Sequence, residues 1–190
     1  MRIFRRRPFP RRWRAVRRMG PAAQVALARL QQAHAWLAQG AYPQAAALFT
    51  ELAEEASARG LPRAPQLFLQ AGRAHILAGE TASGIACLRQ GLTRMAKLGQ
   101  VGRLPRVAHR VLDELRARGL STEADSLQAE LPALVPGLRV EAPLAASGSA
   151  RRLPAKCPYC GGTVHPESVE WLDEMSATCD YCGSVVQAET

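Results

Sequence analysis

Four cysteines close to the C-terminus constrain the fold of this 190-residue chain more than any other feature. They form two Cys-x-x-Cys pairs separated by eighteen residues, and each pair is followed by a glycine, Gly161 or Gly183, as in a turn that needs a positive φ. Two such turns can bring four thiolates to one tetrahedral metal ion, the closed geometry of structural zinc. We therefore predict one Zn²⁺ per chain, with the ligands Cys157, Cys160, Cys179 and Cys182.

Other interpretations of the four cysteines fit this spacing less well. A disulfide framework is typical of small secreted chains, but no signal peptide is visible, so we expect a reducing compartment. Thiol–disulfide exchange uses one Cys-x-x-Cys at the start of a helix, whereas two glycine-followed pairs share one short segment here. Iron accepts the same four sulfurs and stays the alternative metal. We expect His165 to be a surface residue, because four thiolates already fill a tetrahedral site.

Two short strands are expected between the pairs, Val169 to Trp171 and Ser176 to Thr178. Strands this short do not sustain a core, so metal ligation is expected to supply most of the folding energy of the segment. The CPYCGG and CDYCGS turns and the VEW strand between them resemble the zinc ribbon family. The resemblance implies a small β module at residues 156–190, but zinc ribbons occur in proteins of many functions.

Helical spacing of apolar residues runs through residues 21–134 and is clearest from Ala45 to Ala56. Glycines interrupt this region nearly every twenty residues, and a glycine after a helix is the usual left-handed stop. Five stops predict six helices of roughly fifteen residues, joined by short turns and therefore antiparallel to their neighbours. The five glycines are Gly40, Gly60, Gly79, Gly99 and Gly119.

Every second glycine marks a longer repeat of thirty-nine to forty residues. Small residues recur five positions after these glycines, at Ala45, Gly84 and Ala124, where two helices can approach closely. We predict three stacked helical hairpins, with a plain six-helix bundle as the alternative. The stretch from Trp36 to Phe49, with its Gly-x-Tyr turn, resembles the tetratricopeptide repeat. That resemblance implies a solenoid whose concave face binds a protein or peptide partner.

The net charge of +9 is unevenly distributed. Residues 1–18 contain nine arginines and no acid, whereas residues 156–190 contain one lysine and six acids. We expect residues 1–20 to be a disordered tail and residues 135–155, rich in Pro, Gly, Ala and Ser, to be a linker. One interpretation of the tail is a solvated leader, and the other is an arm for nucleic acid or anionic lipid. The arginines that would contact an anionic partner are Arg5, Arg6, Arg7, Arg11, Arg12, Arg14, Arg17 and Arg18.

The sequence offers no candidate catalytic residues. His34 and His75 are interpreted as packing or surface residues, and Cys87 as a small core residue. No apolar run reaches eighteen residues, so we expect no transmembrane segment.

We therefore expect a mainly α protein, a tetratricopeptide-like solenoid followed by a zinc ribbon, similar to bacterial proteins that carry a zinc-ribbon domain. The expected function is that of a non-enzymatic, cytoplasmic adaptor with a protein partner. The alternative function is association with RNA or DNA through the arginine-rich tail, and the alternative location is a peripheral position at an anionic surface.

Overall fold

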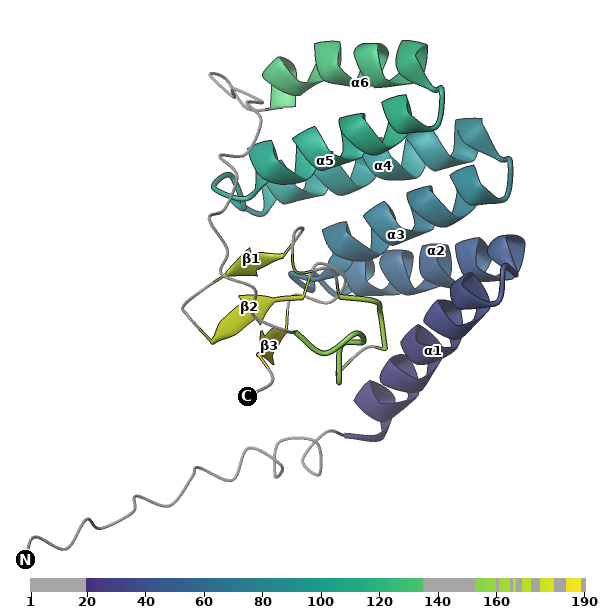
Figure 1. Ribbon diagram of the computed structural model, residues 1–190, viewed down its shortest axis with the longest axis vertical. Helices are drawn as coiled ribbons and strands as arrows, with labels where there is room; N and C mark the ends of the chain where they lie inside the picture. The colour runs from purple at the N-terminus through teal and green to yellow at the C-terminus, as the bar shows by residue number, and fades with distance from the viewer. Residues whose placement is uncertain are drawn as a thin grey trace, which may run out of the picture.

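Six helices and a small sheet make up the described part of the chain (Figure 1). The computed structural model describes residues 20–134 and, after a gap at 135–152, the stretches 153–159, 161–164, 166, 169–171, 175–179 and 184–188. The mainly helical class and the six helices are confirmed, whereas the predicted tail up to residue 19 and most of the predicted linker lie outside the described residues. The helices are α1 (Pro21–Ala38), α2 (Tyr42–Ala58), α3 (Ala64–Leu77), α4 (Thr81–Lys97), α5 (Leu104–Ala117) and α6 (Ser121–Leu134).

One hydrogen-bond pattern ends five of the helices. After α1, the N–H of Gly40 donates to the carbonyl of Leu37 at 3.3 Å, and the N–H of Ala41 donates to that of Trp36 at 2.9 Å. This pair of bonds is the Schellman motif, which needs a left-handed residue at the glycine position. The same two bonds recur at the four other predicted stops, and all five glycines have a positive φ. Proline at the first or second position begins α1, α2, α3 and α5, where its missing N–H costs no helical bond.

The tightest packing in the helical region lies between α3 and α4. A Cβ atom added at Gly84 would lie 2.5 Å from Cγ1 of Ile76 and 2.9 Å from the carbonyl oxygen of Gly72. A Cβ added at Gly72 would likewise lie 2.8 Å from the carbonyl oxygen of Gly84. The small residue predicted at this position of the repeat therefore lets two helix backbones approach each other directly.

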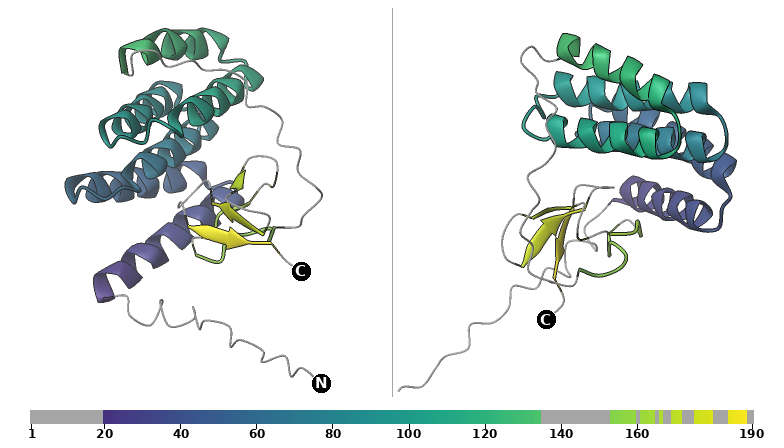
Figure 2. Two further views of the ribbon diagram at one scale, coloured as in Figure 1. Left: turned by 90° about the vertical axis from the view of Figure 1, so that its left-hand side faces the viewer. Right: turned by 45° about the horizontal axis from the view of Figure 1, so that its top comes forward.

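Helices two places apart in sequence also contact each other, which arranges α3 to α6 in two layers (Figures 1 and 2). Arg73 of α3 donates to Glu114 of α5 at 2.7 Å, and Arg89 of α4 donates to Glu130 of α6 at 2.6 Å. Both pairs join residues forty-one positions apart, close to the spacing of the glycine repeat. Equivalent helices of successive hairpins therefore lie side by side.

The sheet contains three antiparallel strands in the order β1 (Glu170–Trp171), β2 (Ser176–Thr178) and β3 (Val185–Gln187). The first two strands were predicted, and the third was not. Val186 in β3 is buried while its two neighbours are exposed, so a three-residue strand offers only one apolar side chain to the core. A signal this short is easily missed, because alternation needs several residues to be recognised.

The sheet module packs against the first half of the helical region. Its buried residues Leu153, Val164 and Val186 form one hydrophobic cluster with residues of α1, α2 and α3, including Leu30 and Phe49. The views in Figures 1 and 2 agree in placing the sheet beside α1. A second cluster joins part of α3 to α4, α5 and α6. Leu153, which precedes the predicted boundary at 156, is among these buried residues.

None of the helices in the described part of the chain is both long and apolar enough to cross a membrane.

Candidate metal centre

The first predicted cysteine pair begins in a tight turn closed at its base by backbone hydrogen bonds. Lys156 and Thr163 face each other as an antiparallel bridge, and the N–H of Cys157 donates to the carbonyl of Gly162 at 2.8 Å. The N–H of Gly161 donates back to the carbonyl of Cys157 at 2.9 Å. Gly161 has a φ of +76°, as predicted for the residue after the second cysteine, because only glycine adopts this conformation at little cost.

The second predicted pair begins where β2 ends. The N–H of Cys179 donates to the carbonyl of Ser184 at 2.8 Å, immediately before β3. In both turns, therefore, the first cysteine donates to the carbonyl five residues further along the chain. The second Cys-x-x-Cys occupies the connection of the β2–β3 hairpin, just as the first lies inside the Lys156–Thr163 bridge.

Both first cysteines are buried in the hydrophobic cluster that the module shares with α1, α2 and α3. Cys157 is 2% exposed and Cys179 is fully buried. No disulfide involves either of them or Cys87. Cys160 and Cys182, the second residue of each pair, lie outside the described residues, and so does His165. The described half of the predicted site fits a metal-binding turn in backbone geometry and in burial.

Within the described stretches, no three His, Cys, Asp or Glu side chains lie together as a set of metal ligands. Two of the four predicted ligands fall outside these stretches, so the zinc site stays a prediction.

Comparison with known proteins identifies no family. No family model, curated protein or solved structure matches this chain.

A cleft separates the first cysteine turn from α1. Its volume is about 450 Å³, and its walls come from Gln31 and His34 of α1 and from Lys156 and Thr163 of the turn. His34 is buried, and its ring meets Phe49 edge-on at 5.1 Å. This contact is the usual geometry of packed aromatic rings. His34 therefore packs in the core between α1 and α2, which is the first of the two roles predicted for it, a packing or a surface residue.

A polar cluster that sequence reasoning missed joins α2, α3 and α4. Nδ1 of His75 lies 2.6 Å from Oε2 of Glu80, and Nε2 of His75 lies 3.2 Å from the hydroxyl of Thr50. The same hydroxyl lies 2.9 Å from the carbonyl oxygen of Ala46, which can accept its hydrogen. The sequence signal was the position of Glu80 directly after the glycine stop that follows His75.

Cys87 lies next to this cluster without being activated by it. Burial raises the pKa of the Cys87 thiol, and the charge of Glu54 raises it further, while a hydrogen bond with Thr50 lowers it. A thiol with a raised pKa stays protonated at neutral pH and is a weak nucleophile. The carboxylate of Glu80, the imidazole of His75 and the hydroxyl of Thr50 contact one another in that order, and the Cys87 thiol lies beside Thr50. These contacts tie three helices together and present no activated nucleophile.

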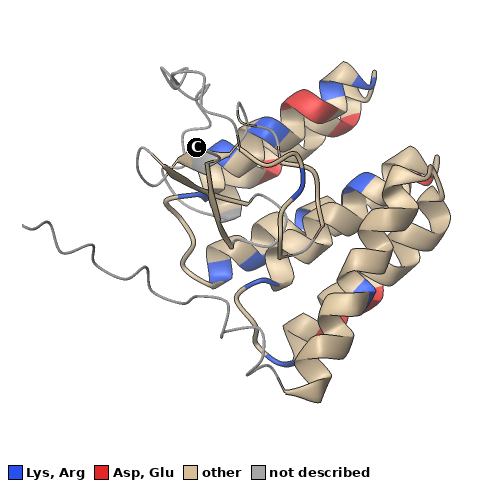
Figure 3. Ribbon diagram, turned by 60° about the horizontal axis from the view of Figure 1, so that its bottom comes forward, with Lys and Arg blue, Asp and Glu red and all other residues tan. Residues whose placement is uncertain are grey.

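The arginines expected to contact an anionic partner, Arg5, Arg6, Arg7, Arg11, Arg12, Arg14, Arg17 and Arg18, all lie outside the described residues. Five of the six described helices carry charged side chains of one sign only, whereas α5 carries both signs. The helices α2 and α6 carry acids and no lysine or arginine, whereas α3 and α4 carry arginines and no acid. Figure 3 shows the lysines and arginines of the described helices in blue and their acids in red.

Proposed function

We propose that this chain is a zinc-dependent, non-enzymatic adaptor. Its helical hairpins bind a protein partner, and its zinc-ribbon module is a second, structural contact element. The observation that carries the proposal is the pair of matched cysteine turns, whose buried first cysteines belong to the same hydrophobic cluster as α1, α2 and α3. A small metal-binding module that shares its apolar core with the helices supports a role in binding a partner and not in catalysis.

The repeat character of the helices supports the partner-binding half of the proposal. Five identical Schellman stops and two ion pairs at the same forty-one-residue separation favour three stacked hairpins over a plain bundle. Stacked helical hairpins expose one long face, formed by the first helix of each hairpin, and such faces bind extended partners. In this chain that face is formed by α1, α3 and α5.

Four thiolates would hold the metal of the module. Cys157, Cys160, Cys179 and Cys182 would complete a tetrahedral sphere, so zinc would supply cross-linking and not catalysis. Each pair of ligands lies in the turn of a hairpin-like segment. One ion bound to both turns would fix the β2–β3 hairpin relative to the bridge between Lys156 and Thr163. Iron would hold the same geometry, and metal analysis of the purified protein separates the two.

A metal titration tests the zinc half of the proposal with a matched control. We expect one zinc per wild-type chain, a loss of zinc in Cys160→Ser, and full zinc content in Cys87→Ser. The control changes the same chemical group at a buried position. Full zinc content in Cys160→Ser would contradict the ligand assignment.

A capture experiment with the full chain tests the partner half. Val107 on α5 is partly buried beside α3, and Val101 lies exposed in the turn before α5. We expect Val107→Trp to remove captured proteins and Val101→Trp to retain them, with nuclease treatment changing neither result. Capture that survives Val107→Trp would place the partner elsewhere.

The arginine tail favours a second candidate function, association with RNA or DNA. Residues 1–18 contain nine arginines and no acid, so they attract phosphate groups strongly. A titration of RNA and DNA at several salt concentrations compares the wild type with a variant whose tail arginines are glutamine. Loss of the salt dependence in the variant would support this candidate, and an unchanged slope would eliminate it.

A further inference from the structure

Two turns at one end of the helices lie side by side and protrude from the helical region. They join α2 to α3 and α4 to α5 (Figure 1), and Nε2 of Gln100 in the second turn donates to the carbonyl of Pro62 in the first at 3.0 Å. A Cβ atom added at Gly60, Gly99 or Gly102 would have no atom within 4 Å from another part of the described chain. Both turns are therefore uncovered at these glycines.

Large apolar side chains are exposed in both turns. Leu61 is 38% exposed in the first turn, and Leu98 and Val101 are 47% and 48% exposed in the second. Leu61 is the chain neighbour of Pro62, and Val101 is that of Gln100, so the hydrogen bond between the turns brings the apolar residues close to one another. An exposed apolar patch with a polar rim is typical of a surface that contacts a protein or a membrane.

The rim of this patch is basic. Arg59 and Arg63 are exposed two positions before and after Leu61, and the exposed Lys97 directly precedes Leu98. These three cations take part in none of the ion pairs of the described residues. The surface they form with the apolar residues, the turn surface, consists of Arg59, Leu61, Arg63, Lys97, Leu98 and Val101.

Acids are absent from the sequence around the turn surface. Residues 56–79 and 81–112 include both turns and contain no aspartate or glutamate. Glu55, the acid that precedes the first of these stretches, is paired with Arg29 at 2.6 Å. The turn surface therefore has a net positive charge and attracts anions.

Shape and chemistry favour an anionic membrane as the partner over a peptide or a nucleic acid. Cations at a bilayer surface attract anionic headgroups, and apolar side chains beside them enter the boundary with the acyl chains. A peptide usually docks in a groove or on a sheet edge, whereas these turns protrude. Unpaired bases stack on aromatic side chains, and residues 59–63 and 97–103 contain none.

We propose that the turn surface docks on a membrane that contains anionic lipids. Its three cations pair with the phosphates of the headgroups, and its three apolar side chains insert between the headgroups. The inference goes beyond the proposed function, because it adds a membrane location, at one end of the helices, to a partner site on the face of α1, α3 and α5.

Co-flotation of the full, zinc-loaded chain with lipid vesicles tests the proposal. The background is the variant whose tail arginines are glutamine, so that the tail does not dominate the binding. We expect vesicles with about a third of phosphatidylserine to be bound at least about tenfold more tightly than vesicles of phosphatidylcholine alone. Arg63→Gln with Lys97→Gln should weaken binding to the anionic vesicles by about tenfold. Leu98→Gln should weaken it by about threefold without changing its salt dependence.

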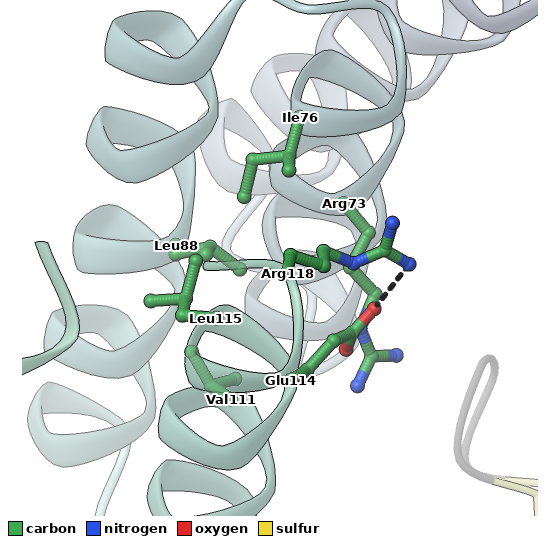
Figure 4. Close-up of a pocket in the computed structure, with 7 residues that line it drawn as sticks. All are labelled: Arg73, Ile76, Leu88, Val111, Glu114, Leu115 and Arg118. Carbon is green, nitrogen blue, oxygen red and sulfur yellow. Dashed lines mark hydrogen bonds and ion pairs between the residues drawn. The ribbon is translucent and has the colours of Figure 1, made fainter. Parts of the chain in front are cut away.

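Matched controls separate the turn surface from net charge and from apolar exposure in general. Arg116→Gln with Arg118→Gln removes the same charge at the opposite end of α5, where Arg118 pairs with Glu114 at 3.4 Å (Figure 4). Val25→Gln makes the apolar-to-polar change on α1, at a residue that is 59% exposed. We expect less than about a twofold effect from either control. Circular dichroism verifies that every variant is folded.

Equal binding of the two kinds of vesicle, or equal losses in a turn-surface variant and its control, would overturn the proposal. A larger loss of affinity for an RNA oligonucleotide than for anionic vesicles in Arg63→Gln with Lys97→Gln would overturn it in favour of nucleic acid. Partner capture is tested independently, because Val107→Trp leaves both turns unchanged and Val101→Trp keeps an apolar side chain in its turn. If the vesicle tests fail while Val107→Trp still abolishes capture, the adaptor function stands without the membrane location.

Discussion

The helical region and the sheet module are organised on opposite principles. The helices satisfy their own backbone bonds, five of them end in a Schellman motif, and large apolar side chains such as Phe49 and Leu92 are completely buried. The strands of the module contain two or three residues each, and the buried core residues in its described stretches are few and mostly small. The helices can therefore be held by apolar packing, whereas the module needs either a metal or the helices beside it.

The largest expected effect comes from removing the metal. We expect chelation, or Cys157→Ser, to unfold the module at residues 153–188 while most of the helical circular dichroism remains, because zinc binding contributes about 10 kcal/mol or more to folding of such modules. Hydrogen exchange read by mass spectrometry locates the loss. If the module stayed protected from exchange without metal, its folding would not depend on zinc, because the helices alone would hold it.

The second effect tests the direct contact of α3 and α4. Gly84→Val places a branched side chain where a single Cβ already lies 2.5 Å from Ile76, so we expect a loss of about 3 kcal/mol in the free energy of unfolding. Urea denaturation of the zinc-loaded protein measures it. Gly102→Ala is the control, because no atom lies within 4 Å of its added Cβ and its φ is not positive. Similar stabilities of the two variants would mean that α3 and α4 can separate without cost.

A third effect tests whether the two regions share one core. Leu153 is buried in the cluster that includes α1 and α2, and Leu153→Ala should cost about 2 kcal/mol through the cavity it leaves. Exchange protection should then fall both in residues 153–188 and in residues 21–58. Val185→Ala, at an exposed position of the same module, should change neither. A loss confined to the module would show that the two regions unfold independently.

The smallest effect concerns the ion pairs between equivalent helices. Arg89 and Glu130 are 44% and 39% exposed, so solvent screens their attraction, and Arg89→Gln should cost only about 0.5 kcal/mol. The cost should disappear in 1 M salt, where charges about 3 Å apart are screened. The carboxylate of Glu130 raises the pKa of Arg89, which agrees with an attraction but does not add to this figure. A cost above about 2 kcal/mol would make the pair a principal support of the α4–α6 contact.

The glycine spacing made the helical region largely predictable. Gly40, Gly60, Gly79, Gly99 and Gly119 each end a helix because a left-handed residue is required there, and no tertiary contact is needed to see it. The close approach at Gly84 was also predictable, since a small residue at a repeated position marks a helix crossing. In the module, β1 and β2 were predicted and β3 was missed, because its single buried residue gives almost no pattern.

Contacts between distant segments were beyond the sequence. The cluster of His75, Thr50 and Glu80 depends on how α2 lies against the α3–α4 turn. The position of the module beside α1 follows a predicted linker of about twenty residues, which allows many placements.

By itself, the sequence determined the helix ends, the spacing of the cysteine pairs and the separation of charge along the chain, because these follow from local backbone chemistry and from composition. Only the tertiary structure decided that Leu153 and Val164 pack with α1 and α2, and that Arg73 of α3 pairs with Glu114 of α5. The physical reason is that burial and charge proximity depend on which surfaces meet, and many pairs of surfaces are compatible with the same local pattern.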